Sequence, residues 1–304
     1  MQLIRGLHNL KKLNGCALTI GNFDGVHSGH QEIIRRLTAK AKELGVPSVV
    51  ISFSVTPQTF FGFPKACLSN FRDKHTLLES LGVDKHLLIR FNKAFSETSA
   101  NSFIEEIIMG QLNARYCLIG DDFRFGKDRL GDFDLLEKYA KLSGFSADKL
   151  GDIQIKGRRV SSSAIRGCLA LGEFDRAEQL LGRPYSISGL IAHGAKQGRT
   201  IGFPTINVDI RRQLSPVLGV FAVLVDINGV VRFGVCNVGR RPTVGGEKTL
   251  LEVFLFDFDQ EVYGEHATVV FKNRVREEKK FASFDELKIQ IAEDVKSAKR
   301  FFKI

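Results

Sequence analysis

The sequence predicts two domains of different class: an α/β domain with a parallel, doubly wound sheet, and after it a small antiparallel β-barrel. The chain has 304 residues, which exceeds one typical domain. In the first half, short apolar runs alternate with segments of helical periodicity, the pattern of parallel strands joined by crossover helices. In the second half, β-branched and aromatic runs follow one another with turn signals between them, which is typical of a barrel.

The first half supplies the elements of the parallel sheet in order. The apolar run 17–20 predicts a strand, and 30–44 predicts a helix because its apolar residues recur three or four positions apart. Further elements are expected as strands at 49–53, 87–91 and 116–119 and as a helix at 100–112. In an open sheet of this kind, ligands bind at the carboxyl ends of the strands.

The second half predicts a six-stranded barrel with a closing C-terminal helix. Asn228-Gly229 and Gly245-Gly246 are turn signals between strand-like runs. The apolar positions of the last segment, from about residue 284, lie three or four apart and predict the helix. The change of pattern near 181–184 sets the predicted boundary between domains 1–183 and 184–304. The six strands are expected at 185–192, 204–208, 220–227, 230–238, 250–256 and 267–271.

The charge balance favours an anionic ligand. Lys and Arg number 44 against 34 Asp and Glu, for a formal net charge of +10. A basic surface suits phosphates, nucleotides or nucleic acid, and the charge does not choose among them. A basic nucleic-acid-binding protein therefore stays open as a remote alternative, although no RNA-binding signature supports it.

Compartment is indicated by what the sequence lacks. No apolar run approaches the roughly 20 residues of a spanning helix, and the first residues do not follow the plan of a signal peptide. The cysteines are scattered without a C-x-x-C pair, which disfavours a disulfide framework or a cysteine zinc site. We expect a cytoplasmic protein with no membrane contact. The five cysteines are Cys16, Cys67, Cys117, Cys168 and Cys236.

The segment 21–30 (GNFDGVHSGH) joins the first strand to the first helix and predicts a phosphate site. Glycines allow close backbone approach, and a helix N-terminus offers free N–H groups and partial positive charge. His27 and His30 would donate hydrogen bonds to a phosphate chain and stabilise charge on departing pyrophosphate. A glycine-rich turn with incidental histidines is the plain alternative; zinc is less favoured, because H-E-x-x-H and a third ligand are absent.

This segment resembles the H-x-G-H signature of the nucleotidylyltransferase superfamily, in the form found in bacterial bifunctional riboflavin kinase/FMN adenylyltransferases. The segment 120–126 (GDDFRFG) is similar to that family's second motif, and 161–166 (SSSAIR) is similar to its third. The resemblance implies a Rossmann-like nucleotidylyltransferase α/β/α domain. It also implies a nucleotide and flavin site formed by Gly21, Asn22, Phe23, Asp24, Asp122, Ser161, Ser162, Ser163 and Arg166.

One segment departs from the family pattern. The family carries T-F-x-P-H-P after its second strand, near the flavin, whereas this chain has Ser52-Phe53-Ser54-Val55-Thr56-Pro57. The first proline and the histidine are replaced. A riboflavin kinase with weak or lost adenylylation is therefore kept as the nearest alternative.

A second phosphate-binding segment lies in the barrel half. Residues 189–207 are dense in glycine and cations, but the lysine does not sit in a Walker A pattern, and no G-x-G-x-x-G occurs in the chain. The segment resembles the riboflavin kinase signature G-x-x-x-G-R-x-L-G-[FW]-P-T-x-N. The resemblance implies nucleotide or flavin contacts by His193, Lys196 and Gly198, and Mg²⁺–ATP binding by Thr205 and Asn207. A hydroxyl and an amide oxygen, two residues apart on one strand face, suit magnesium.

Glu252 is the predicted catalytic residue of this half. A lone carboxylate among apolar strand residues is costly unless it is paired or used. The segments 234–243 and 251–256 resemble the family's G-V-A-N-I-G-x-R-P-T segment and its catalytic-glutamate strand, which implies roles for Arg240 and Glu252. A solvent-facing strand carboxylate is the alternative. Arg276 begins a segment similar to the R-x-E-x-K-F element that closes over flavin, or else a solvated charge run.

The resemblance covers essentially the whole chain and implies two reactions. The barrel would phosphorylate riboflavin to FMN, with Glu252 as general base and Mg²⁺–ATP as phosphoryl donor. The α/β domain would transfer AMP from ATP to FMN, giving FAD and pyrophosphate. The implied partners are riboflavin, FMN and ATP, with self-association possible and no nucleic acid.

Overall fold

The computed structural model describes residues 1–193, 202–210, 214–243 and 246–304, and the chain divides into two compact units. The first comprises Met1–Lys65 and Phe71–Ser161, and the second comprises Ala66–Asn70 and Ser162–Ile304. The predicted division at 183/184 stays a proposal about functional modules. No helix among the described residues has both the length and the apolarity needed to cross a membrane.

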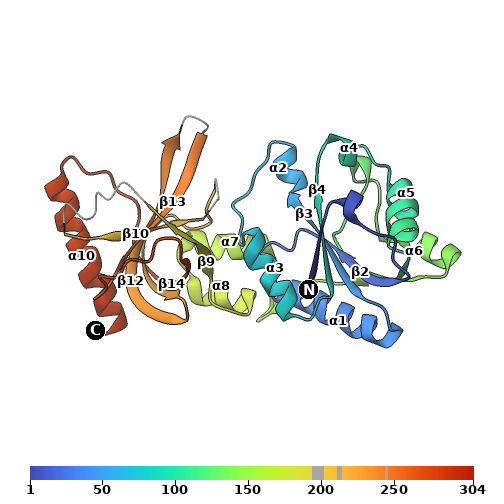
Figure 1. Ribbon diagram of the computed structural model, residues 1–304, viewed down its shortest axis with the longest axis horizontal. Coiled ribbons are helices and arrows are strands. Elements are labelled where there is room, and N and C mark those ends of the chain that lie inside the picture. The colour runs from blue at the N-terminus through green and yellow to red at the C-terminus, as the bar shows by residue number, and fades with distance from the viewer. Residues whose placement is uncertain (194–201, 211–213, 244–245) are drawn as a thin grey trace. The chain divides into compact units, whose positions relative to one another are not determined.

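The first unit is built on a six-stranded parallel sheet, as the alternating pattern predicts (Figure 1). Its strand order is β1-β4-β3-β2-β5-β6, and every pair is parallel. Two strands escaped the sequence analysis, because β1 is short and β6 carries alternating polar residues. The strands are β1 (Gln2–Arg5), β2 (Cys16–Ile20), β3 (Ser48–Val55), β4 (Lys85–Arg90), β5 (Ala114–Gly120) and β6 (Ser146–Leu150).

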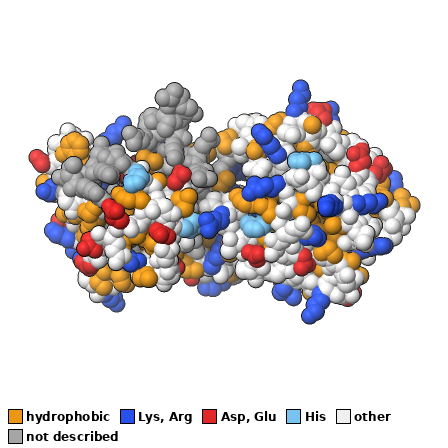
Figure 2. All heavy atoms as spheres, viewed as in Figure 1, with side chains coloured by type: hydrophobic (Ala, Val, Ile, Leu, Met, Phe, Trp, Pro, Cys, Tyr) orange, Lys and Arg blue, Asp and Glu red, His pale blue; other side chains and the backbone are white. Residues whose placement is uncertain are grey.

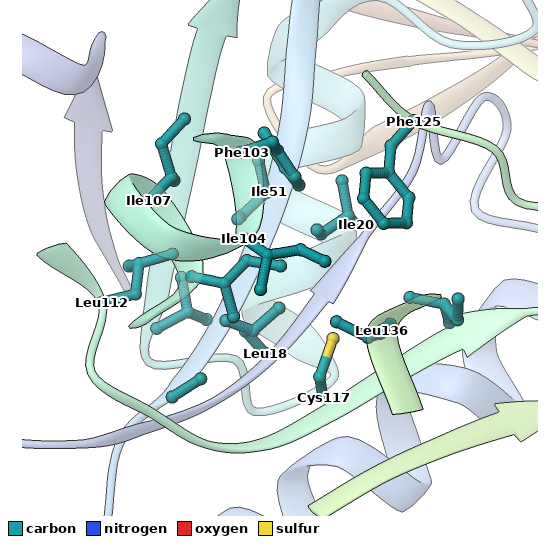
Figure 3. Packing of buried hydrophobic residues seen from close by; sticks show 14 of the residues in the cluster. Leu18, Ile20, Ile51, Phe103, Ile104, Ile107, Leu112, Cys117, Phe125 and Leu136 are labelled. Atoms are coloured by element: carbon teal, nitrogen blue, oxygen red, sulfur yellow. The ribbon is translucent and has the colours of Figure 1, made fainter. Parts of the chain in front are cut away.

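Both faces of this sheet are buried, as a parallel sheet requires. Leu18 and Ile20 of β2 point to one face, where Ile104 and Leu136 pack against them (Figure 3). Ala17 points to the other face, into a cluster that includes buried residues of the first long helix. The described helices of this unit are α1 (Ser28–Leu44), α2 (Pro57–Phe60), α3 (Phe71–Ser80), α4 (Lys93–Ser96), α5 (Ala100–Ser102) and α6 (Phe133–Ser143).

The helix expected at 100–112 differs in kind from an ordinary α-helix. Only α5 is α-helical, and Phe103–Gln111 continues it as a π-helix. Gly110 accommodates the wider turn, because a Cβ there would lie 3.0 Å from the carbonyl oxygen of Glu105, five residues back. The apolar spacing does not distinguish these two helix types, since both bury the same face.

The second unit contains the predicted closed six-stranded barrel, with strand order β10-β13-β12-β11-β14-β9 and antiparallel pairing throughout (Figure 1). Each strand coincides with one that the sequence predicts. The two strands around 244–245 are longer than expected. The strands are β9 (Ser186–Ala192), β10 (Thr205–Asp209), β11 (Gly219–Ile227), β12 (Val230–Thr243), β13 (Gly246–Leu255) and β14 (His266–Arg276).

One helix covers part of the outer face of the barrel, and two shorter helices precede its first strand. The predicted closing helix is α10 (Phe284–Phe302), and its Ala298 packs with Val220 and Val235 on the outer face of the strands. Two shorter helices, α7 (Ser162–Leu171) and α8 (Phe174–Leu181), precede β9. The ring of Phe174 lies 5.7 Å from Phe221, so α8 contributes an aromatic residue to the barrel's core.

Candidate active sites

The first site lies where the strand order of the parallel sheet reverses. From β2 the chain proceeds through β3 to β4 on one side, whereas β5 and β6 lie on the other. The loops at the carboxyl ends of β2 and β5 therefore flank a topological switch point, where ligands of open α/β sheets bind. Residues 21–27 and 120–126 occupy these two loops, which brings the first two predicted motifs to one edge of the sheet.

The loop after β2 adopts a conformation that few side chains favour. Phe23 has φ 47° and Val26 has φ 40°, with Gly25 at 83° between them. Left-handed φ at non-glycine residues persists only where surrounding structure enforces it, and such strain gathers at functional sites. Phe23 anchors the loop from below with 1% of its side chain exposed, while Gly21, Asn22 and Asp24 are partly exposed.

The two predicted histidines meet at the start of α1. His27 is the N-cap, and its Nδ1 accepts a hydrogen bond from the His30 backbone N–H at 3.3 Å. The two rings stack with centroids 3.6 Å apart, and the Phe23 ring lies 5.0 Å from His30. Because Nδ1 accepts, the ring proton of His27 sits on Nε2.

His30 is held in its neutral form. Burial lowers its pKa well below the usual 6.5, and repulsion by His27, when that ring is protonated, and by the charge of Lys74 lowers it further. Its Nδ1 is buried and has no hydrogen-bond partner among the described residues, and the same holds for Oδ1 of Asn22. Buried polar atoms are nearly always satisfied in folded proteins, so two unsatisfied ones within the segment 21–30 indicate a ligand site.

Lys74 belongs to this site and was missed in the sequence. Its side chain is buried on α3, and Nζ donates a hydrogen bond to the backbone oxygen of Asn22 at 2.7 Å. The available signal was weak: one lysine between Asp73 and His75, 44 positions from His30. No motif connects the two, because the contact is made to a backbone atom.

The second and third motifs are placed less completely. Asp122 is exposed and pairs with Arg159 at 3.3 Å, an arrangement that contributes little stability. Ser163 is exposed on α7, and Arg166 donates from Nε to the Ala66 oxygen at 2.6 Å. The residues from Ser162 onward belong to the second compact unit, so their contacts with nucleotide stay predictions, as does that of Ser161.

The segment 52–57, which departs from the family pattern, spans the end of β3 and the start of α2. Ser52 is buried in β3, and its Oγ lies 2.7 Å from Nε2 of His86. Thr56, in place of the family's histidine, caps α2 by accepting from the Thr59 N–H at 3.3 Å. Pro57 then occupies the first turn of the helix, where its missing N–H costs nothing.

The second site is a row of polar residues across three barrel strands. Glu252 of β13 pairs in register with Asn207 of β10 on one side and with Asn237 of β12 on the other. Leu251 and Val253 are almost completely buried, so alternation puts Glu252 on the outer face of the barrel. That face is not simply open to solvent, because Glu252 is only partly exposed.

Neighbouring residues extend this row. Thr205 pairs in register with Phe254 and shares the face of Asn207. The Phe203 ring meets the Phe254 ring edge-on at 5.4 Å, which fixes the start of β10 against β13. Phe254 in turn packs into the cluster beneath α10. The polar row and the helix-covered apolar cluster are therefore adjacent parts of one face.

Arg276 is fixed by a partner that the sequence analysis did not name. Its guanidinium forms a bidentate pair with Asp294 of α10, with Nε–Oδ1 and Nη2–Oδ2 distances both 2.8 Å. Asp294 is buried with 3% exposure and also accepts from Gln290. A buried carboxylate requires such pairing, which makes this a link between β14 and the closing helix.

Two of the remaining predicted residues belong to the barrel unit, and two lie outside the described residues. The ring of His193 lies 3.9 Å from that of Tyr263, and Arg240 is exposed on β12 opposite Thr249. Lys196 and Gly198 lie outside the described residues. No group of three or more His, Cys, Asp and Glu side chains suited to holding a metal occurs in the described part of the chain. Asn237 was quoted within a motif but not singled out, although its register beside Glu252 makes it part of the row.

Comparisons with known proteins match the two halves of the chain to two families. A family model described as FAD synthetase matches residues 9–164, and one described as riboflavin kinase matches 181–302. A protein of Haemophilus influenzae is 47% identical over 99% of both chains, and one of Escherichia coli K12 is 44% identical over 99% of this chain and 98% of its own. Both are named bifunctional riboflavin kinase/FMN adenylyltransferase.

A solved structure shares the fold along the whole chain. A Streptococcus pneumoniae protein, described as a macrolide-efflux protein, has a TM-score of 0.81 and 29% identity, covering 98% of this chain and 99% of its own. The match supports the α/β unit and the barrel, and its efflux description concerns that protein. With both family models in chain order and full-length relatives above 40% identity, the chain belongs to the bifunctional riboflavin kinase/FMN adenylyltransferases, which use ATP to convert riboflavin to FMN and FMN to FAD.

Proposed function

We propose that the polar row on the outer face of the barrel is where riboflavin is phosphorylated. The observation that carries this proposal is the register that sets Glu252 between Asn207 and Asn237. Glu252 accepts the proton of the terminal ribityl hydroxyl while that oxygen attacks the γ-phosphorus of ATP. The neighbouring asparagines orient the carboxylate and the phosphate chain, because a strand ladder holds all three at fixed spacing.

Thr205 and Asn207 are the proposed magnesium-binding residues. Their hydroxyl and amide oxygens lie two residues apart on one face of β10, beside the carboxylate in register on β13. Hard oxygen donors of this kind fit Mg²⁺, which takes its other ligands from water and nucleotide phosphates. When bound, the ion neutralises charge on the phosphates, while the chain's own residues fix where the phosphates lie.

The loop 21–27 and the start of α1 form the proposed adenylyl-transfer site. The nucleophile here is the FMN phosphate, which is already anionic, so no strong base is required. His27 donates from Nε2, and neutral His30 donates from one ring nitrogen, to the phosphates that leave as pyrophosphate. The N–H groups at the N-terminus of α1 add partial positive charge.

Further contacts are proposed from the motifs. Gly21, Asn22, Phe23 and Asp24 are proposed to contact the nucleotide. Asp122 of the second motif and the segment 161–166 of the third are proposed as further nucleotide contacts. In the barrel module, 184–304, His193, Lys196, Gly198 and Arg240 contact nucleotide or flavin. Arg276 lies against the flavin while Asp294 holds its guanidinium.

Incubating the purified protein with riboflavin, ATP and magnesium and then separating the flavins by chromatography tests this assignment. Both FMN and FAD are expected from riboflavin. When FMN is added in place of riboflavin, FAD is the expected product. The altered segment 52–57 supplies a second reading, a kinase with weak adenylylation. That alternative predicts FMN accumulation with little FAD even at long times, and efficient FAD formation excludes it.

Three properties outside the reactions complete the proposal. The five cysteines are scattered along the chain without a C-x-x-C pair, which supports a cytoplasmic setting. On the face seen in Figure 2, Lys and Arg are interspersed with Asp and Glu, which argues for small anionic ligands rather than nucleic acid. Nucleic-acid binding would appear as affinity that falls steeply with salt. Self-association stays a prediction, to be measured by sedimentation.

A further inference from the structure

Lys74 stands out because its long charged side chain is buried, with 8% exposed. Lysine is rarely buried this deeply, because removing its charge from water is costly. Its Nζ lies 2.7 Å from the backbone oxygen of Asn22, in the loop that precedes the two histidines. The site as derived from motifs gives this residue no role.

The Asn22 carbonyl oxygen, which Lys74 contacts, lies at the start of a loop with strained backbone. Asn22 immediately precedes Phe23, which is the first residue of this loop with positive φ. Positive φ recurs at Gly25 and at Val26. Such backbone relaxes unless neighbouring contacts enforce it. A hydrogen bond from a charged donor is stronger than one from a neutral donor, so Lys74 is suited to this task.

The helix that carries Lys74 is itself fastened to the sheet. His75, the next residue of α3, has its Nδ1 3.0 Å from Nδ1 of His86 on β4. Nε2 of His86 lies 2.7 Å from the Ser52 hydroxyl on β3. The ring of Phe71 stacks with both histidines, at centroid distances of 5.6 Å and 5.9 Å. A buried polar chain therefore ties α3 to two strands just behind Lys74.

The charge of Lys74 also acts on the reacting groups. It contributes to holding His30 neutral, together with burial and the stacked His27. A fixed cation that is buried attracts a polyphosphate more strongly than one in solvent does. Removing the charge while leaving the helix in place would therefore change both the loop and the imidazole.

We propose that Lys74 is a positioning residue for adenylyl transfer, holding the Asn22 carbonyl and thereby the phosphate-binding loop in its reactive conformation. The inference rests on the proposed assignment of the loop 21–27 and His30 to this reaction. Its anchor is the chain His75–His86–Ser52, which sets the position of α3. Lys74 acts through the loop and through His30, and no contact of its own with substrate is required.

The test compares Lys74→Met with Lys74→Arg and with Arg72→Met in the full-length protein. Lys74→Met keeps the length and apolar stem of the side chain but removes the charge and the donor. Lys74→Arg restores both. Arg72→Met is the matched control, because it removes a cation from an exposed position of the same helix. The rates of FMN-to-FAD and riboflavin-to-FMN conversion are measured for each, with kcat and KM for ATP separated.

Lys74→Met should lower kcat for FAD formation about 100-fold, since misplacing a reacting group by an ångström costs that much. Riboflavin phosphorylation should stay unchanged, and Arg72→Met should match the wild type in both reactions. Lys74→Arg should recover about tenfold of the loss, because it keeps a charged donor. In ¹³C-histidine NMR, the pKa of the His30 imidazole should rise in Lys74→Met and not in Arg72→Met.

The inference is overturned if folded Lys74→Met retains kcat within about twofold, or if Lys74→Arg is as impaired as Lys74→Met. His30→Ala, measured in parallel, separates this failure from that of the site itself: if His30→Ala forms FAD at the normal rate, the site assignment fails. If Lys74→Met does not fold, His75→Phe decides. It keeps the stacked ring but removes the hydrogen bond to His86, and an unchanged kcat there would also overturn the inference.

Discussion

The two proposed sites of this chain place their chemistry on different kinds of structure. The adenylyl-transfer site is a loop and a helix start, with strained backbone, N–H groups and neutral imidazoles. The kinase site is a row of side chains on adjacent strands, centred on a carboxylate. The difference follows from the nucleophiles, because a phosphate is already charged whereas a hydroxyl must lose a proton. One site needs donors for phosphates, and the other needs an acceptor for a proton.

The two constructions are also held in place differently. The strand ladders on both sides of β13 hold the backbone of Glu252 in register with β10 and β12. The loop 21–27 has no ladder, and it depends on the Phe23 anchor, the His27 cap and Lys74. The comparison predicts that single substitutions in each region will affect one reaction and spare the other.

The largest expected effect is that of Glu252→Gln on riboflavin phosphorylation. Losing the general base should lower kcat by about 10³-fold or more, within the range measured for such groups. FMN-to-FAD conversion by the same preparation should stay within about twofold, because that nucleophile needs no base. Glu261→Gln, at an exposed position after the same strand, is the control. Damage to both reactions in a folded protein would break the comparison.

The converse substitution is His30→Ala, with a somewhat smaller effect. Removing one donor to a developing charge typically costs about 10²- to 10³-fold, so FAD formation should fall by that amount while FMN formation persists. His8→Ala removes an exposed histidine of the same unit and should change neither rate. Quantifying both flavins in one reaction mixture makes the two activities mutual controls. If His30→Ala forms FAD at the normal rate, the proposed role of the His30 imidazole in adenylyl transfer is wrong.

How far the sequence could lead depends on what each residue contacts. Glu252, Asn207 and the two histidines sit in dense local motifs, and strand alternation alone puts Thr205 and Asn207 on one face. The six barrel strands and the parallel sheet could be predicted from the sequence, because hydrophobic periodicity reflects burial directly. β6 was not, because its alternating polar residues carry no apolar run.

The roles of Lys74 and Asp294 could not be predicted from local sequence patterns, for another reason. Each acts across a long sequence separation, Lys74 on the Asn22 backbone and Asp294 on the Arg276 guanidinium. A single sequence does not encode which distant backbone oxygen a lysine will meet. The π-helix Phe103–Gln111 was likewise hidden, since its apolar spacing is also that of an α-helix.

A moderate effect is expected from Asn207→Ala in the proposed magnesium pair. Losing one of two protein oxygens should raise the magnesium concentration needed for half-maximal kinase rate about tenfold, as for other ligand-shell losses. Saturating magnesium should restore much of kcat for riboflavin phosphorylation, because the proposed general base Glu252 is still present. FAD formation should keep its wild-type magnesium dependence. Asn273→Ala, at an exposed position of β14, is the control. If Asn207→Ala shows the wild-type dependence on magnesium concentration, Asn207 is not a magnesium ligand.

The smallest expected effect concerns stability and pH in the α/β unit. Burial, with the charges of Lys74 and His75, lowers the pKa of His86 to about 3 from its usual 6.5. The unfolded chain therefore takes up a proton near pH 6.5 that the folded chain refuses. The stability from this residue is complete above pH 6.5 and is lost as pH falls towards 3. Between pH 7.5 and 5.5 the loss should be about 1 kcal/mol.

Thermal unfolding of full-length wild type and His86→Gln at both pH values isolates this contribution. His86→Gln should be less stable at pH 7.5, because the bonds to Ser52 and His75 are altered, yet it should lose less stability on acidification. His30 also has a lowered pKa and titrates in both proteins, so only the difference between them reports on His86. His8→Gln, at an exposed position, should follow the wild type. If wild type and His86→Gln lose equal stability, the histidine chain behind Lys74 is open to water, and the loop site loses the rigid support that sets it apart from the strand-built barrel site.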